Sequence, residues 1–194
     1  MAYERQMTPV TLPPPPPHVP MATWKKALII FIALTIFVSG AIVFMAIVGW
    51  LGLDKHGKDI WVEVNSQILN ACFTFVAVVM HPMRLRCLFH MLRFRSTGDS
   101  KHLLAIQKDF PNVPLNTAEE QLRFFKIIIL FNVNSTFQYP IVVAMWGYKY
   151  DVRPNAIIIV FLPLAMIAGT VAGIWQALIE RRYKKELAAL ATTA

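Results

Sequence analysis

With 194 residues, of which 56% are hydrophobic and only 15% charged, the chain is too apolar for an ordinary soluble domain. Two cysteines, Cys72 and Cys87, exclude a disulfide framework. The apolar residues fall into four long blocks, which a soluble fold does not need. We therefore expect an all-α integral membrane protein with a four-helix transmembrane bundle.

The chain begins with a polar tail, residues 1–22, that contains five consecutive prolines, Pro13 to Pro17. Such a run forms neither a helix nor a strand, so the tail is expected to be disordered or in the polyproline II conformation. Two interpretations stay open. The tail is either a ligand for a cytosolic proline-recognising protein or a stiff spacer.

A membrane domain is expected over residues 23–183, followed by a short C-terminal tail at 184–194. Tryptophan and lysine side chains flank the first apolar block and are typical of membrane interfaces. Pro140 and Pro163 lie inside later blocks, where we expect kinks. The predicted spans cover residues 27–51, 60–80, 124–146 and 156–179.

Orientation follows from the lysines and arginines. The N-terminal segment up to Lys26, the segment from Arg84 to Lys126 and the C-terminal segment from Arg181 onward together carry 15 of them, whereas the two other loops carry 4. Cytosolic segments are the ones enriched in these residues. We therefore expect both termini and the long loop at residues 81–123 to be cytosolic, in a membrane that the sequence does not identify.

The long loop should begin with an amphipathic helix. Leu85, Leu88, Phe89 and Leu92 recur at helical spacing, with basic side chains opposite. This pattern favours a helix in the inner membrane interface, although a helix packed on a partner protein would show it too. Four arginines are expected to contact phosphates of anionic inner-leaflet lipids: Arg84, Arg86, Arg93 and Arg95. Cys87 is either palmitoylated or a plain buried thiol.

Further along the loop, a short helix is expected around residues 100–110, followed by a turn that contains two prolines. Asn116 and Thr117 each have a glutamate three residues later, Glu119 and Glu120. This spacing indicates the start of a capped helix, which should run unbroken into the third span.

Polar residues inside the second and third spans are the main candidates for function. They form one helical face on each span: Glu63, Gln67, Asn70 and Thr74 on the second, Asn134 and Gln138 on the third. Gln67 matches Gln138 in depth, and Asn70 matches Asn134, so direct contacts are expected. The faces are either a polar pathway or binding site, or hydrogen bonds that hold helices together. With a single acid and no buried lysine or arginine, no coupled ion site is expected.

Signals for other activities are weak. Gly169 and Gly173 form a GxxxG step that favours helix packing and homo- or hetero-oligomers. No familiar catalytic or phosphate-binding motif is present. His81 and His90 could meet only if the chain broke at Pro82, so no metal site is expected. We expect no catalytic residue, no cofactor and no nucleic-acid partner.

Three segments carry a resemblance to a known family: SQILNACFTF from Ser66, HPMRLR from His81, and MWGYKYDVRPN from Met145. Together they resemble fungal-type multi-pass membrane proteins defined only as a domain of unknown function, over about residues 60–180. Two departures are an aromatic expected in place of Met83 and a longer cytosolic loop. The resemblance implies a membrane location and no particular activity.

These observations favour a non-enzymatic scaffold or accessory subunit that recruits cytosolic partners and anionic lipid. The alternative is a small transporter or channel component that uses the polar face of the second and third spans. An intramembrane enzyme is the third candidate.

Overall fold

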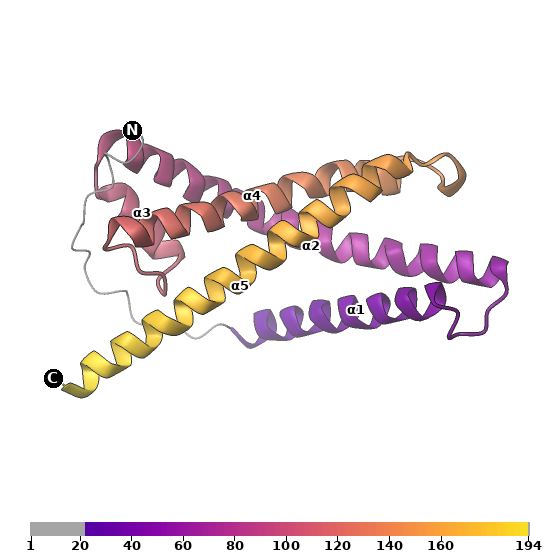
Figure 1. The fold of residues 1–194 in the computed structure, drawn as a ribbon, viewed down its shortest axis with the longest axis horizontal. Helices are drawn as coiled ribbons and strands as arrows, with labels where there is room; N and C mark the ends of the chain where they lie inside the picture. The colour runs from indigo at the N-terminus through magenta and orange to yellow at the C-terminus, as the bar shows by residue number, and fades with distance from the viewer. Residues whose placement is uncertain (1–21, 194) are drawn as a thin grey trace. The chain divides into compact units, whose positions relative to one another are not determined.

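The structure, a computed structural model, describes residues 22–193 and is all-α over this range. It therefore confirms the expected all-α class for the described residues, whereas nearly all of the proline-rich tail lies outside them. The elements follow one another in Figure 1 as α1 (Thr23–Ile47), α2 (Lys55–Thr97), α3 (Lys101–Asp109), α4 (Ala118–Gly147), the short 3-10 helix η1 (Tyr150–Val152) and α5 (Asn155–Thr193).

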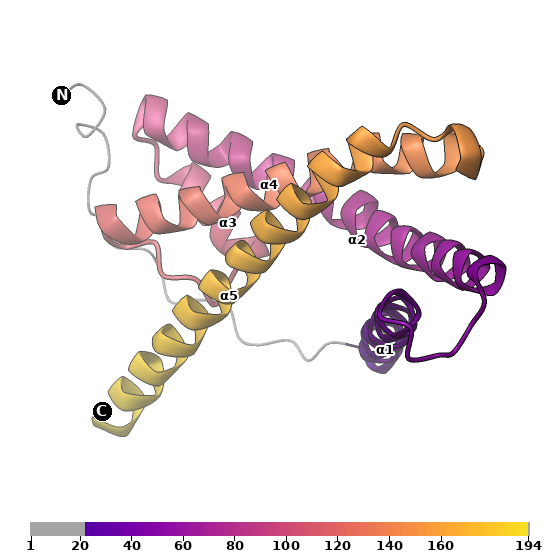
Figure 2. The same cartoon turned by 45° about the vertical axis from the view of Figure 1, so that its right-hand side comes forward.

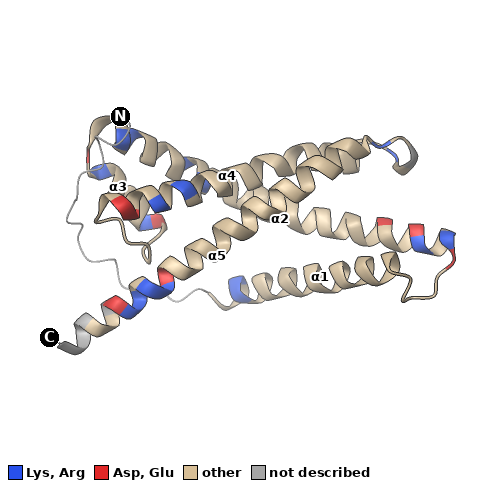
Figure 3. Cartoon of the chain, in the orientation of Figure 1, with Lys and Arg blue, Asp and Glu red and all other residues tan. Residues whose placement is uncertain are grey.

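Four of these helices, α1, α2, α4 and α5, are long and apolar enough to cross a membrane. Figure 3 shows that long stretches of these helices contain no charged residue, notably α1 beyond its first turn and the first part of α5. A helix of about 20 apolar residues spans the hydrocarbon core. The four candidate spans agree with the four predicted from the sequence and fit an integral membrane protein.

The first span ends earlier than predicted. Its helix stops at Ile47 rather than near residue 51, because the backbone turns at Gly49 (φ 81°) and again at Gly52 (φ 61°). Side chains with a Cβ rarely adopt such positive φ angles, so these glycines end the helix although Trp50 and Leu51 remain apolar. The hydrophobic run and the helix therefore have different ends.

The described chain divides into two compact units, which are treated separately below. The α3 unit comprises residues 80–135 and 164–193, and the α1 unit comprises residues 22–79 and 136–163. The long helices α2, α4 and α5 each contribute to both units. Each of them contains one proline near the point of division: Pro82, Pro140 and Pro163.

The α3 unit has a hydrophobic core of its own. Met91 and Phe94 of α2, Leu103 and Ile106 of α3, and Phe124 of α4 are fully buried. Met91 and Phe94 are three residues apart, as are Leu103 and Ile106, so each pair lies on one helix face. Burial of this apolar area holds the short helix α3, which matches the predicted helix around 100–110, against its neighbours.

The start of α4 is capped as the sequence predicts. Thr117 Oγ1 accepts a hydrogen bond from the Glu120 backbone N–H at 3.2 Å, and Glu120 Oε2 accepts one from the Thr117 N–H at 2.9 Å. Of the two possible caps, Thr117 with Glu120 forms the reciprocal box. From there α4 runs unbroken to Gly147, as expected.

The α1 unit contains two hairpins, α1 with the first part of α2, and the end of α4 with the start of α5 (Figure 2). Lys58 closes the first hairpin, because its Nζ donates a hydrogen bond to the carbonyl of Ile47 at 3.3 Å. In the second, the rings of Phe137 and Phe161 pack edge to face with centroids 5.2 Å apart. This unit holds the candidate polar site described next.

Candidate functional site

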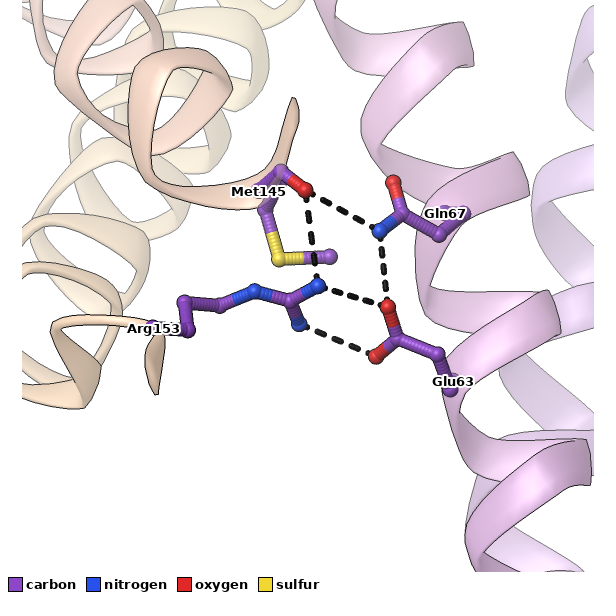
Figure 4. A network of polar contacts seen from close by, with 4 residues as sticks. All are labelled: Glu63, Gln67, Met145 and Arg153. Atoms are coloured by element: carbon purple, nitrogen blue, oxygen red, sulfur yellow. Dashed lines mark hydrogen bonds and ion pairs between the residues drawn. The ribbon is translucent and has the colours of Figure 1, made fainter. Parts of the chain in front are cut away.

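The first polar cluster lies on α2 in the α1 unit. Glu63 and Gln67 are one helical turn apart and share a face, and Gln67 Nε2 donates to Glu63 Oε1 at 2.8 Å. The same nitrogen donates to the carbonyl of Met145 at 3.1 Å (Figure 4). Met145 lies in the last turn of α4, where backbone carbonyls have no helical partner. Arg153 Nη2 also donates to this oxygen, at 3.4 Å, so Gln67 and Arg153 together satisfy a carbonyl that the helix end leaves unpaired.

Arg153 completes this cluster from the loop between η1 and α5. Its Nη1 donates to Glu63 Oε2 at 2.9 Å and its Nη2 to Glu63 Oε1 at 2.6 Å. Arg153 precedes a proline, which favours the extended backbone observed there. Only 6% of its side chain is exposed, against 25% for Glu63. The planar guanidinium matches the carboxylate in a two-point contact.

Arg153 and Glu63 together form a neutral, fixed link between α2 and the loop before α5. Hydrogen bonding to Glu63 raises the pKa of the Arg153 guanidinium, which therefore keeps its charge. The sequence-based expectation of an acid without a buried arginine was wrong, because Arg153 was counted only as a loop charge. Glu63 itself was a signal for such a partner in the sequence, since an acid inside a span needs a counter-charge.

The predicted pairing between the two polar faces was also wrong. Gln67 bonds Glu63 and Met145, and Gln138 Nε2 finds no partner among the described residues. Asn70 likewise has no hydrogen-bond partner for either of its amide atoms there, and neither does Thr74 Oγ1. Two residues at the same depth in the membrane make contact only if both helices are rotated so that their faces meet, and depth does not determine that rotation.

A second polar cluster lies in the α3 unit around Arg84. Its Nη1 donates to Ser135 Oγ at 2.7 Å, and its guanidinium lies 4.5 Å from the ring centroid of Phe131. Asn134 Oδ1 and the carbonyl of Phe131 accept weaker bonds at 3.5 Å. Asn132 Nδ2 donates to the backbone carbonyl of Arg84 at 3.2 Å. Arg84 therefore ties α2 to α4, and Ser135 is a site residue that the sequence did not indicate.

The other three arginines of the predicted lipid-contact set differ in their surroundings. Arg86 forms an ion pair with Asp109 at the end of α3. The Arg95 guanidinium lies 4.7 Å from the centroid of the Phe125 ring, and that of Arg93 lies 5.4 Å from the ring of Phe89. Arg84 Nη1 donates to protein groups of α4, because a long side chain on α2 reaches that helix, whereas the lipid contact of the four arginines stays a prediction.

The predicted apolar face of the same helix segment points outward. Leu85, Phe89 and Leu92 are each about half exposed, whereas Leu88 packs against the core. The buried face is the neighbouring one, where Cys87 is fully buried next to Met91. Full burial of Cys87 favours the plain thiol over the palmitoylated one. The outward apolar row keeps the interfacial-helix prediction open.

Gly169 of α5 packs tightly against Asn134 of α4 in the α3 unit. Asn134 Nδ2 donates to the carbonyl of Ala165 at 2.8 Å, and a Cβ on Gly169 would lie 2.7 Å from that nitrogen. Gly169 therefore serves a contact within the chain. A Cβ on Gly173 would meet nothing within 4 Å, so only one glycine of the GxxxG step is used here.

Histidines meet at one place that the sequence did not suggest. His90 Nδ1 lies 3.1 Å from His102 Nδ1, which joins α2 to α3 through a shared hydrogen bond. His81 lies elsewhere on α2, which runs through Pro82 without a break. In the described residues no group of three or more histidine, cysteine, aspartate or glutamate side chains is arranged to hold a metal ion.

These features define an all-α protein with four candidate membrane spans whose internal charges are held by protein partners. Residues 21–94 match a family described as a protein of unknown function (DUF2985). The matched range contains Glu63, Gln67 and Arg84 but neither Arg153 nor Ser135, and it begins and ends earlier than the resemblance suggested. No curated protein and no solved structure matches the chain.

Proposed function

We propose that this protein is a non-enzymatic membrane scaffold or accessory subunit whose α1 packs against helices of another membrane protein or of a second copy. The observation that carries the proposal is the exposure of α1. Of its 25 residues only Ser39 and Ala46 are buried. A span with so few contacts in its own chain offers nearly its whole surface to lipid or to a partner helix.

The internal charges support the same role. Glu63 is paired with Arg153, and the Arg84 guanidinium bonds Ser135. Groups that carry an ion or a proton must be able to release their partners, whereas these contacts tie α2 to α4 and to the loop before α5. In this proposal residues 81–123 and both termini lie in the cytosol, where they recruit soluble partners and anionic lipid, and the proline-rich tail is one candidate for that recruitment.

A photo-crosslinking side chain tests the role of α1. Phe37 of α1 and Ile159 of α5 are 74% and 70% exposed, so a crosslinker at either position reaches its surroundings. A crosslinker at Phe37 should give one reproducible protein adduct in native membranes, and the control at Ile159 should give mainly lipid adducts. Two differently tagged copies then separate a homo-oligomer from a hetero-oligomer. Lipid adducts alone at Phe37 would contradict the proposal.

A small transporter or channel component is the second candidate, and one observation favours it. Asn70 and Gln138 are each 4% exposed, yet Asn70 has no hydrogen-bond partner among the described residues and Gln138 Nε2 has none either. Polar groups in a membrane interior without partners mark a water or solute path in many transporters. Flux across proteoliposomes that contain the protein, lost on Asn70→Leu, would support this function over the scaffold.

A further inference from the structure

A groove in the α3 unit lies between the start of α4 and the end of α5 and has a volume of about 240 Å³. On α5, Trp175, Ile179, Arg182 and Glu186 line it at spacings of four, three and four, which places them on one helix face. On α4, Glu120 and Arg123 form the facing wall. The groove therefore has an apolar end and a charged end.

This arrangement matches the profile of a membrane interface. The fourth span predicted from the sequence ends at residue 179, inside the stretch of α5 that lines the groove, so the groove lies across the end of that span. Trp175 and Arg182 are seven residues apart, which is about 10 Å along a helix. The headgroup region is about 5–8 Å thick on each side of the hydrocarbon core, so this spacing lets Trp175 lie at the edge of the core while Arg182 reaches the headgroups.

The charges that line the groove balance one another. Arg123 and Arg182 supply two positive groups, and Glu120 and Glu186 supply two negative ones. Glu120 is partly used by the α4 cap and Arg123 by an ion pair with Glu119. Arg182 and Glu186 have no ion-pair partner among the described residues and lie one turn apart. A headgroup with a phosphate and an ammonium complements this pair better than a purely anionic one.

We propose that the groove binds an aminophospholipid, with its phosphate on Arg182, its ammonium on Glu186 and its acyl chain along Trp175 and Ile179. This inference deepens the lipid-binding part of the proposed function and rests on it only in placing the end of α5 at the membrane surface. It also assigns the phosphate contact to a different place from the arginines of α2, of which Arg84 and Arg86 bond protein groups.

Native mass spectrometry of the purified full-length protein tests this assignment. Phosphatidylethanolamine, phosphatidylcholine and phosphatidylglycerol with identical acyl chains are offered at equal concentration. We expect phosphatidylethanolamine to bind best, because choline has no N–H to donate and glycerol has no cation. Arg182→Gln should weaken that binding about tenfold, since it removes a charge-assisted contact.

Arg181→Gln is the matched control, because Arg181 carries the same charge one residue away and does not line the groove. It should leave lipid binding unchanged, and Glu186→Gln should reduce phosphatidylethanolamine to the level of phosphatidylcholine. Equal losses for Arg181→Gln and Arg182→Gln, or equal binding of the three lipids, would overturn the proposal. Size-exclusion profiles check that each variant is folded. Such a failure would leave the crosslinking result for α1 untouched, so the two proposals are separately testable.

Discussion

Glu63 and Arg153 are 90 residues apart in the sequence, and their side chains meet through two hydrogen bonds of 2.6 and 2.9 Å. This contact joins a membrane helix to the loop that leads into another. Both side chains are largely buried, so water cannot easily replace either charged partner.

Arg153→Gln should therefore destabilise the protein by about 1–3 kcal/mol, because it leaves the Glu63 carboxylate without its counter-charge. Adding Glu63→Gln should recover part of the loss, since the paired amides carry no net charge. Thermal unfolding in detergent measures both, and Lys149→Gln, an exposed residue of the same loop, is the control. Strictly additive effects of the two changes would mean that the side chains do not interact.

The two glycines of α5 should respond in opposite ways to alanine. Gly169→Ala places a methyl group against the Asn134 amide and should break its bond to Ala165, at a cost of about 1–3 kcal/mol. Gly173→Ala meets open space and should be neutral or stabilising by up to about 1 kcal/mol, because alanine favours a helix.

A background that carries Asn134→Ala provides a check on the mechanism. In that background the new methyl group displaces no asparagine amide, so Gly169→Ala should lower the stability only slightly further. Unfolding temperatures of the four variants report the comparison. Were Gly169→Ala equally harmful without the asparagine side chain, the glycine would be needed for some other contact.

Arg84 should matter for stability and Arg93 should not. Arg84→Gln removes the bonds to Ser135 and Asn134 and should lower the free energy of unfolding by about 1–3 kcal/mol. Arg93→Gln, on the exposed side of the same helix, should change it by less than about 0.5 kcal/mol. Binding to vesicles with anionic lipid should show the reverse order. A loss of vesicle binding with intact stability for Arg84→Gln would restore the original lipid-contact interpretation.

The topology is tested with single cysteines in a background without Cys72 and Cys87. Cysteines at Lys55 and Lys149 should react with a membrane-impermeant maleimide that is added outside intact cells. Cysteines at Lys101 and Lys185 should react only after permeabilisation, because the bias of lysine and arginine places them inside. Reaction of the residue at 101 before permeabilisation would reverse the proposed orientation.

Local patterns in the sequence were enough to predict the helices. Long apolar blocks identify membrane spans because the bilayer demands a fixed length of apolar chain, and Thr117 with Glu120 marks a helix start because the cap needs only four consecutive residues. The short helix α3 follows from the same kind of local signal. These features depend on neighbours in the sequence, so the sequence alone determined them.

The partners of the polar side chains depended on the tertiary structure. Gln67 reaches Met145 rather than Gln138, and Arg84 reaches Ser135 on a neighbouring helix. Helical spacing says which residues share a face, but the rotation of each helix and the course of the connecting loop decide what that face meets. The extended loop that carries Arg153 back to Glu63 shows the reason, because a side-chain contact across 90 residues leaves no trace in local periodicity.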